Sequence, residues 1–273
     1  MRRWSLGMMF GLIVVVAGSP TPIVGQTPSA ETTYTPPRTS DGHPDIQGTW
    51  QVLNAAHWDL EGATARLGVP TGHGWVDGGT GTIPYQPWAL AKKKENFAKR
   101  AELGGWSGDP EAKCLVGGVP RMTYMGPFQI IQQADKVTFL YQYRRFLRRV
   151  YMNGNSHPEG PIEFWMGDSR GRWEGNTLVI DVVHFNDKTW FDRAGNFHSE
   201  ELHVIERYTP TTPYHMLYEA TIEDPKVFTR PWKISMPLYK LQGREAELME
   251  YRCDAYLLDQ EWDKPNSTYF QER

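Results

Sequence analysis

The chain has 273 residues, of which 40% are hydrophobic, so it is long enough and apolar enough to fold around a core and is not a disordered chain. Its formal charge of -3 excludes electrostatic recruitment of a nucleic acid. Aromatic residues make up 13% of the chain, which favours strands and a core built from rings.

The first 25 residues have the layout of a secretory signal peptide: basic residues after Met1, an apolar run, and then small residues. The apolar run is shorter than the ~20 residues that a membrane helix needs. Residues 26–40 are rich in Thr, Pro and Ser and predict a disordered leader, and residues 41–273 are expected to form a single domain. We therefore expect a periplasmic or secreted protein without a membrane span.

Cys114 and Cys253 are the two cysteines of the sequence. An even pair in an exported protein predicts a disulfide bond, and two buried free thiols are the alternative.

The predicted elements begin with a short strand over 49–53. Residues 54–115 are then dominated by Gly and Pro, with one predicted helix over 87–103 that begins at Pro87. An insertion of this length is expected to be a functional lid or a structural cover over one opening of the fold.

From residue 121 onward the chain alternates apolar and polar residues between turns, as β-hairpins do. The predicted strands are 128–132, 137–143, 145–152, the two arms of the hairpin 171–185 around Gly175 and Asn176, 201–208, 214–222, 232–241 and 247–256. This spacing predicts an all-β fold: a single antiparallel barrel of roughly eight to ten strands, a type that can enclose a small ligand.

Several long strings together are similar to a large group of exported, mostly uncharacterised proteins of soil bacteria. They are DGHPDIQGTW (41–50), KCLVGGVPRM (113–122), WMGDSRGRWEGNTLVID (165–181), HFNDKTWFDRAGNFHSEELHVIERY (184–208), EDPKVFTRPW (223–232) and EYRC (250–253). The resemblance implies a lipocalin-like, or calycin-like, β-barrel and export more than it implies an activity. Many members have Gly before the FND string, where this chain has His184.

The densest polar cluster lies around the predicted strand 201–208, and two orientations of this strand remain open. If Glu201, His203 and Arg207 face solvent, the opposite row, which is mostly apolar, fills the barrel. If they face the lumen, they work with Asp181: the histidine serves as acid or base, a carboxylate fixes its tautomer, and Arg207 holds an anionic group.

The same segment also suggests a weaker hypothesis of metal binding. His198, Glu201 and His203 could supply three ligands to Zn, Fe or Mn, although the spacing is not that of a helical zinc site. Ser169, next to Asp168 in a Gly-flanked turn, is a weak candidate nucleophile because no histidine is near it in sequence.

Aromatic residues supply candidate ligand contacts. Rings in strands are more often core residues, but some could line a cavity for a flat or greasy molecule, and Arg121 in the GGVPRM loop could point to a barrel mouth. The candidates for substrate binding are Arg121, Tyr124, Tyr141, Trp165 and Trp190.

Three functions follow from these residues. The first is the binding of a small hydrophobic or aromatic molecule in the barrel lumen, with no assured cofactor. The second is an enzyme that performs acid/base chemistry on such a molecule, as an isomerase, hydratase, lyase or cyclase. The third is a metal-dependent hydrolase or oxygenase. The orientation of strand 201–208 distinguishes the first two.

Overall fold

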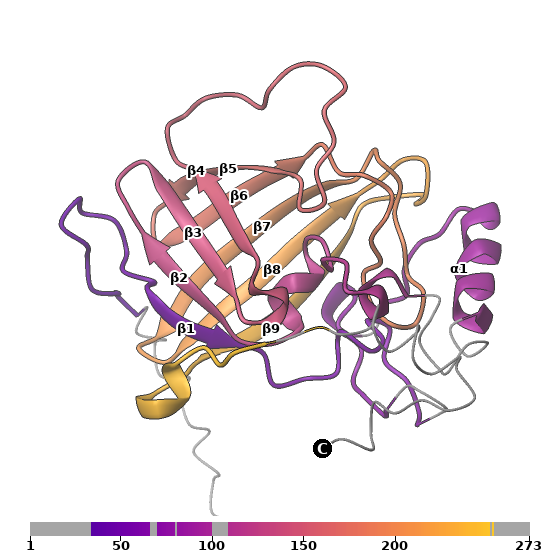
Figure 1. The fold of residues 1–273 in the computed structure, drawn as a ribbon, viewed down its shortest axis with the longest axis horizontal. Coiled ribbons are helices and arrows are strands. Elements are labelled where there is room, and N and C mark those ends of the chain that lie inside the picture. The colour runs from indigo at the N-terminus through magenta and orange to yellow at the C-terminus, as the bar shows by residue number, and fades with distance from the viewer. Residues whose placement is uncertain (1–33, 66–69, 80, 100–108, 252, 254–273) are drawn as a thin grey trace, which may run out of the picture. The chain divides into compact units, whose positions relative to one another are not determined.

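The computed structural model describes residues 34–65, 70–79, 81–99, 109–251 and 253. Within these residues, nine strands form a closed barrel in which each strand pairs with the next one in sequence and β9 pairs with β1 (Figure 1). The predicted all-β barrel is therefore confirmed. The strands are β1 (Gly48–Gln51), β2 (Phe128–Gln132), β3 (Lys136–Tyr141), β4 (Leu147–Tyr151), β5 (Asp168–Glu174), β6 (Thr177–Val183), β7 (His203–Thr212), β8 (His215–Glu223) and β9 (Trp232–Lys240).

The strands form where the sequence alternates, because successive side chains of a strand point to opposite faces. In β7 and β8 every second residue is buried along most of the strand. Between β5 and β6, Gly175 takes a φ of 60°, the left-handed conformation that a two-residue hairpin turn requires. The hairpin around Gly175 and Asn176 is thus confirmed.

One junction differs from the expected antiparallel barrel: β4 and β5 run parallel. Among the described residues their register consists of one pair, Tyr151 with Arg170, whereas β5 and β6 are paired along seven residues. The chain reaches β5 through a long connection over residues 152–167 instead of a tight turn. We call this weakly paired β4–β5 junction the seam.

The insertion over 54–115 contains the helix α1 (Pro87–Lys99), which begins at Pro87 as predicted. The prediction of its end at residue 103 falls on residues 100–108, outside the described part of the chain. Isolated bridges join the insertion to the barrel and to the turn before β9, at Val76 with Ile234 and at Tyr85 with Phe228. These contacts fit the expected cover over one end of the barrel. The short 3₁₀ turns of the chain are η1 (Asp77–Gly79), η2 (Pro110–Lys113), η3 (Arg121–Tyr124), η4 (Tyr143–Arg145) and η5 (Gly243–Ala246).

Aromatic rings pack in the barrel interior. Phe139 contacts the rings of Phe128, Tyr141 and Tyr208 with centroids between 5.3 and 6.2 Å apart. All four side chains are buried. These rings thus form one part of a core that also contains many aliphatic side chains.

Cys114 and Cys253 form a disulfide bond with their Cα atoms 5.8 Å apart, which confirms the predicted pair. Cys253 follows η5 and does not lie in a strand. The strand predicted over 247–256 is not formed in its described part, residues 247–251 and 253.

The predicted signal peptide, and the leader up to residue 33, lie outside the described residues. Residues 34–40 of the expected leader are described, and Arg38 donates a 2.8 Å hydrogen bond to Asn176 in the β5–β6 turn. In the described residues no helix has the length and apolar character to cross a membrane.

Candidate functional site

Strand β7 has its polar row outside and its mostly apolar row inside. Val204, Glu206 and Tyr208 are fully buried, whereas His203 and Arg207 are partly exposed. Side chains alternate across a strand, so the second set lies on the outer face. The hypothesis that Glu201, His203 and Arg207 point into the lumen is therefore corrected: the lumen receives the opposite row.

The inward row carries a buried ion pair between β7 and β4. Nη2 of Arg148 lies 2.5 Å from Oε2 of Glu206, and both side chains are buried. Nε of Arg148 donates to Oγ of Ser169 at 2.9 Å, and the hydroxyls of Tyr208 and Tyr218 donate to Oε1 of Glu206 at 3.1 and 2.8 Å. Burial by itself lowers the pKa of Arg148, but the charge and hydrogen bond of Glu206, together with the neighbouring Tyr141 and Tyr208, raise that pKa overall. The guanidinium is therefore a permanent cation.

Beside this pair lie Nη1 of Arg148 and the hydroxyl of Tyr141, and both atoms are closed to solvent. Burial raises the pKa of the Tyr141 phenol, and the neighbouring Arg148 and Thr123 oppose that rise. Tyr141 is thus neutral and lies close to Arg148.

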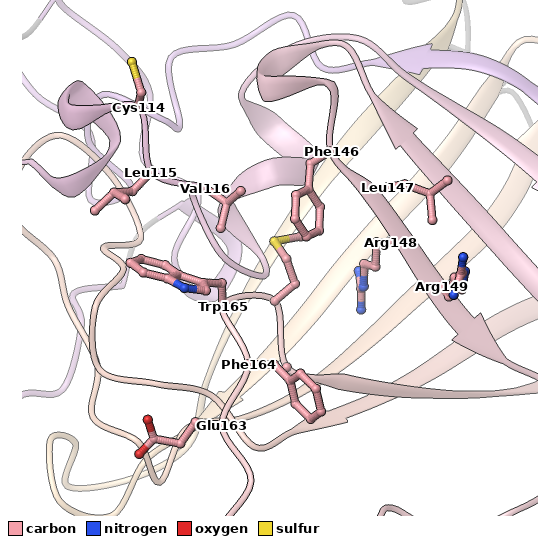
Figure 2. Close-up of a pocket in the computed structure, with 12 residues that line it drawn as sticks. Cys114, Leu115, Val116, Phe146, Leu147, Arg148, Arg149, Glu163, Phe164 and Trp165 are labelled. Atoms are coloured by element: carbon pink, nitrogen blue, oxygen red, sulfur yellow. The ribbon is translucent and has the colours of Figure 1, made fainter. Parts of the chain in front are cut away.

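A cleft of about 520 Å³ opens next to the seam (Figure 2). Its walls come from three segments far apart in sequence: residues 114–116, the start of β4 with Phe146, and residues 163–167 of the β4–β5 connection. We call it the seam cleft. The described residues that line it are Cys114, Leu115, Val116, Phe146, Leu147, Arg148, Arg149, Glu163, Phe164, Trp165, Met166 and Gly167.

The lining of the seam cleft is mostly apolar. Figure 2 shows the rings of Phe146, Phe164 and Trp165 around the space, with the Arg148 guanidinium beside them. Phe164 and Leu147 are 40% and 46% exposed, which is high for large apolar side chains. Neighbouring exposed apolar side chains in a hollow are typical of a ligand site.

A second group of titratable residues lies on the outer face of β6 and β7. His203 Nε2 is 3.0 Å from Oδ1 of Asp181, and His203 Nδ1 is 3.4 Å from Oε2 of Glu223. His157, on the β4–β5 connection, places Nε2 3.3 Å from the same oxygen of Asp181 and Nδ1 2.7 Å from Oδ1 of Asp168. We call these five residues the outer cluster.

The outer cluster favours the protonated form of His203. Its hydrogen bond to Asp181 raises the pKa of His203 above the ordinary value, although partial burial opposes the rise. The same bond lowers the pKa of Asp181. Carboxylates at both ring nitrogens favour the protonated ring, which can donate a proton but has no lone pair to accept one.

The other members of the predicted catalytic row lie near His203 but have different partners. Glu201 is 3.0 Å from Nζ of Lys226, and Arg207 pairs with Glu174 at 2.8 Å. Glu201 and His203 also line a second open cleft of about 550 Å³, together with His184.

The structure does not bring the three predicted metal ligands together. His198 is buried, with Nε2 2.7 Å from Oγ1 of Thr189 and Nδ1 2.8 Å from the carbonyl oxygen of Ser199, and burial lowers its pKa. Glu201 and His203 have the partners described above. In the described residues no group of three or more His, Cys, Asp or Glu side chains could hold a metal ion.

The five predicted substrate-binding residues are dispersed. Trp165 lines the seam cleft, and Tyr141 lies in the interior beside Arg148. Arg121 is buried in a two-point ion pair with Asp109 and therefore does not face an open mouth.

The remaining two of the five lie apart from the seam cleft. Tyr124 donates to the carbonyl oxygen of Phe191 at 2.8 Å, and Trp190 lines a separate cleft near α1. Ser169, the weak nucleophile candidate, is buried and accepts the hydrogen bond from Arg148.

The sequence did not single out Arg148, Glu206 or His157. The sequence pattern could have indicated the first two. Arg148 lies two residues from Val150, and Glu206 lies two residues from both Val204 and Tyr208, so each polar residue shares a strand face with mostly apolar neighbours. His157 lies in the β4–β5 connection, where apolar residues do not recur at a regular spacing, so no sequence pattern indicates it.

Comparison with known proteins adds no family: no family model, no curated protein and no solved structure matches this chain.

Proposed function

We propose that this protein binds a small apolar or aromatic molecule in the seam cleft. The observation that carries the proposal is the lining of the cleft, in which aromatic and aliphatic side chains surround about 520 Å³. Sites for small molecules commonly measure about 300–1,000 Å³ and have such a lining with a few polar groups. A ligand there would cover the exposed faces of Phe164 and Leu147.

The seam cleft differs in place from the lumen that the sequence suggested for the ligand. Packed rings fill the interior around Phe139, so we place the ligand at the barrel wall, where β4 and β5 separate. The signal-like segment, the resemblance to exported soil-bacterial proteins and the disulfide support a binding protein of the periplasm or the cell exterior.

Binding is favoured over turnover by the state of His203. Asp181 raises the pKa of His203, which disfavours the neutral ring that a general base needs, and neither residue lines the seam cleft. The seam cleft, in contrast, needs no titrating group for its function.

The test is the binding of N-phenyl-1-naphthylamine, a neutral fluorescent probe, to the full chain. We expect saturable fluorescence enhancement, and about tenfold weaker binding by Trp165→Ala because the ring supplies a large part of the buried contact area. Trp88→Ala is the matched control, since Trp88 is an exposed indole of the separate cleft near α1. Absence of saturable binding, or equal effects of the two substitutions, would rule out the seam cleft as the site.

A further inference from the structure

One edge of β4 borders the seam cleft and, in the described residues, lacks a paired strand along most of its length. Tyr141 of β3 donates its backbone N–H to the carbonyl oxygen of Phe146, and Met152 donates its own to the carbonyl oxygen of Asp135, just before β3. Residues 146 and 152 therefore direct their backbone groups to the β3 side. Because successive residues of a strand point their backbone groups to opposite sides, the even-numbered residues of β4 face β3 and the odd-numbered ones face the seam.

The odd-numbered residues of β4 are Leu147, Arg149 and Tyr151. Tyr151 pairs with Arg170, and the seam has no second pair among the described residues. The N–H and C=O groups of Leu147 and Arg149 therefore point toward the gap between β4 and residues 163–167, and both residues line the seam cleft. Such a row of unpaired backbone groups is a template to which another extended chain can add as a strand.

The side chains beside this edge specify what kind of chain fits it. Leu147 and Arg149 both lie on the outer face of β4, and Leu147 is 46% exposed. Arg149 has no ion pair with a described residue, whereas Arg148 is paired with Glu206. A strand added to the edge places its own side chains next to Leu147 and Arg149, two residues apart on one face. An apolar side chain and an acidic one complement these two neighbours.

The charges around the edge favour a separate acidic chain over a second copy of this protein. Strand β4 has the sequence LRRVY, without an acidic residue, so two paired β4 edges would leave Arg149 without a countercharge. Glu163 also lines the cleft, but Figure 2 shows its carboxylate on the opposite side of the view from Arg149. A carboxylate brought by a partner therefore meets the arginine without a close acidic neighbour from the cleft lining.

We propose that the seam cleft takes an extended peptide segment that adds as a strand to the edge of β4. The segment carries an apolar side chain beside Leu147 and, two residues away, an acidic side chain beside Arg149. This inference rests on the seam cleft as the binding site of the proposed function and adds the class of partner: the apolar group that the cleft covers belongs to a peptide.

The probe is the capped peptide acetyl-TLTETLT-amide, added to the full chain. Its sequence reads the same in both directions, so it offers an apolar and an acidic residue two apart whether it pairs parallel or antiparallel with β4. We expect saturable binding in calorimetric titration and displacement of N-phenyl-1-naphthylamine from the seam cleft. The peptide with glutamine in place of glutamate should bind about two- to fivefold more weakly, the range of one exposed ion pair.

Two N-methylated forms of the peptide test strand addition itself. One is methylated at the backbone nitrogens of both leucines and the glutamate, and the other at those of the four threonines. Each set of N–H groups faces β4 in one of the two pairing directions. At least one form should bind about tenfold more weakly than the parent peptide, because it loses more than one backbone hydrogen bond.

Substitutions of Arg149 separate its charge from its backbone. Arg149→Ala keeps the N–H, so it should weaken peptide binding about two- to fivefold and abolish the preference for glutamate over glutamine. Arg149→Pro also removes the N–H, which faces the gap and not β3, and should bind about three- to tenfold more weakly than Arg149→Ala. Arg172→Ala, at an exposed arginine of β5 outside the cleft lining, is the matched control and should change nothing. If Arg149→Pro does not fold, the methylated peptides decide.

The outcomes distinguish this inference from the proposed function. If neither N-phenyl-1-naphthylamine nor the peptide binds, the binding function itself fails. If the naphthylamine binds but the peptide does not, or if both methylated peptides bind like the parent peptide, the peptide inference alone is overturned. It is also overturned if the peptide binds only after residues 254–273 are removed, which assigns the edge to the chain itself, or if sedimentation shows a dimer that the peptide does not dissociate.

Discussion

At the scale of single residues, an acidic group of β6 and an acidic group of β7 have opposite surroundings. Glu206 is fully buried against Arg148, whereas Asp181 is about one-third exposed beside His203. We expect Glu206→Gln to lower the free energy of unfolding by about 3–5 kcal/mol, because it leaves a buried guanidinium uncompensated. His203→Gln should lower the free energy of unfolding by less than about 1 kcal/mol. Urea denaturation of both variants checks this ranking, and equal losses would contradict it.

His203 should also give the protein a measurable pH dependence. Its pKa is raised in the folded state by Asp181, so its stabilising contribution is complete below the unfolded value of about 6.5. That contribution is lost as pH rises through the higher folded pKa. The difference in melting temperature between the parent and His203→Gln should therefore narrow between about pH 6 and 8. A constant difference across this interval would show that the histidine does not change charge on folding.

His184 occupies a backbone conformation that favours glycine, with a φ of 63°. Glycine, which lacks a Cβ, is the residue best suited to this conformation. A left-handed residue with a Cβ costs about 1–2 kcal/mol, and the greater chain entropy of unfolded Gly offsets part of this. We expect His184→Gly to be more stable than His184→Ala by about 0.5–1 kcal/mol in thermal melts. The same pair of substitutions at His203, within a strand, should show the reverse order.

At the scale of elements, the disulfide holds together parts of the chain that share no strand pairing. Cys114 precedes η3 and lines the seam cleft, and Cys253 follows η5, 139 residues later in sequence. Reducing the disulfide, which closes this long loop, should lower the free energy of unfolding by about 2–4 kcal/mol, mainly because the unfolded chain gains conformational entropy. The paired variant Cys114→Ser with Cys253→Ser should match the reduced parent protein in urea denaturation. A difference between those two proteins would mean that the serine substitutions disturb the fold by themselves.

The elements differ in how far sequence could predict them. Strands β2, β3 and β9 lie within one or two residues of their predicted bounds, because alternation and turns are local properties. The direction and register in which two strands pair depend on residues far apart in sequence, so the sequence did not predict the parallel pairing at the seam. The seam cleft combines residues 114–116, 147–149 and 163–167, which no periodic pattern connects. Trp165, a predicted ligand contact, nevertheless lines the seam cleft, since its aromatic character does not depend on register.

At the scale of the whole molecule, the barrel closes within the described residues through β1 and β9. Its sheet therefore needs no strand from residues 1–25. We expect a chain without these residues to keep its cooperative thermal melt and, when expressed in bacteria with an oxidising periplasm, to lose export and with it the disulfide. Fractionation and thiol labelling measure both. Undiminished export of the shortened chain would contradict the signal-peptide interpretation.

The parallel seam also follows from the parity of the barrel. Nine strands close the described sheet, and neighbours that alternate strictly up and down can close a ring only if their number is even. An odd ring must contain at least one pair that points the same way, and here that pair is β4 and β5. A parallel pair is thus a topological necessity in a closed ring of nine strands, and its position alone was free to evolve. A descendant that gained or lost one strand could be antiparallel throughout, without the weakly paired junction beside which the seam cleft lies.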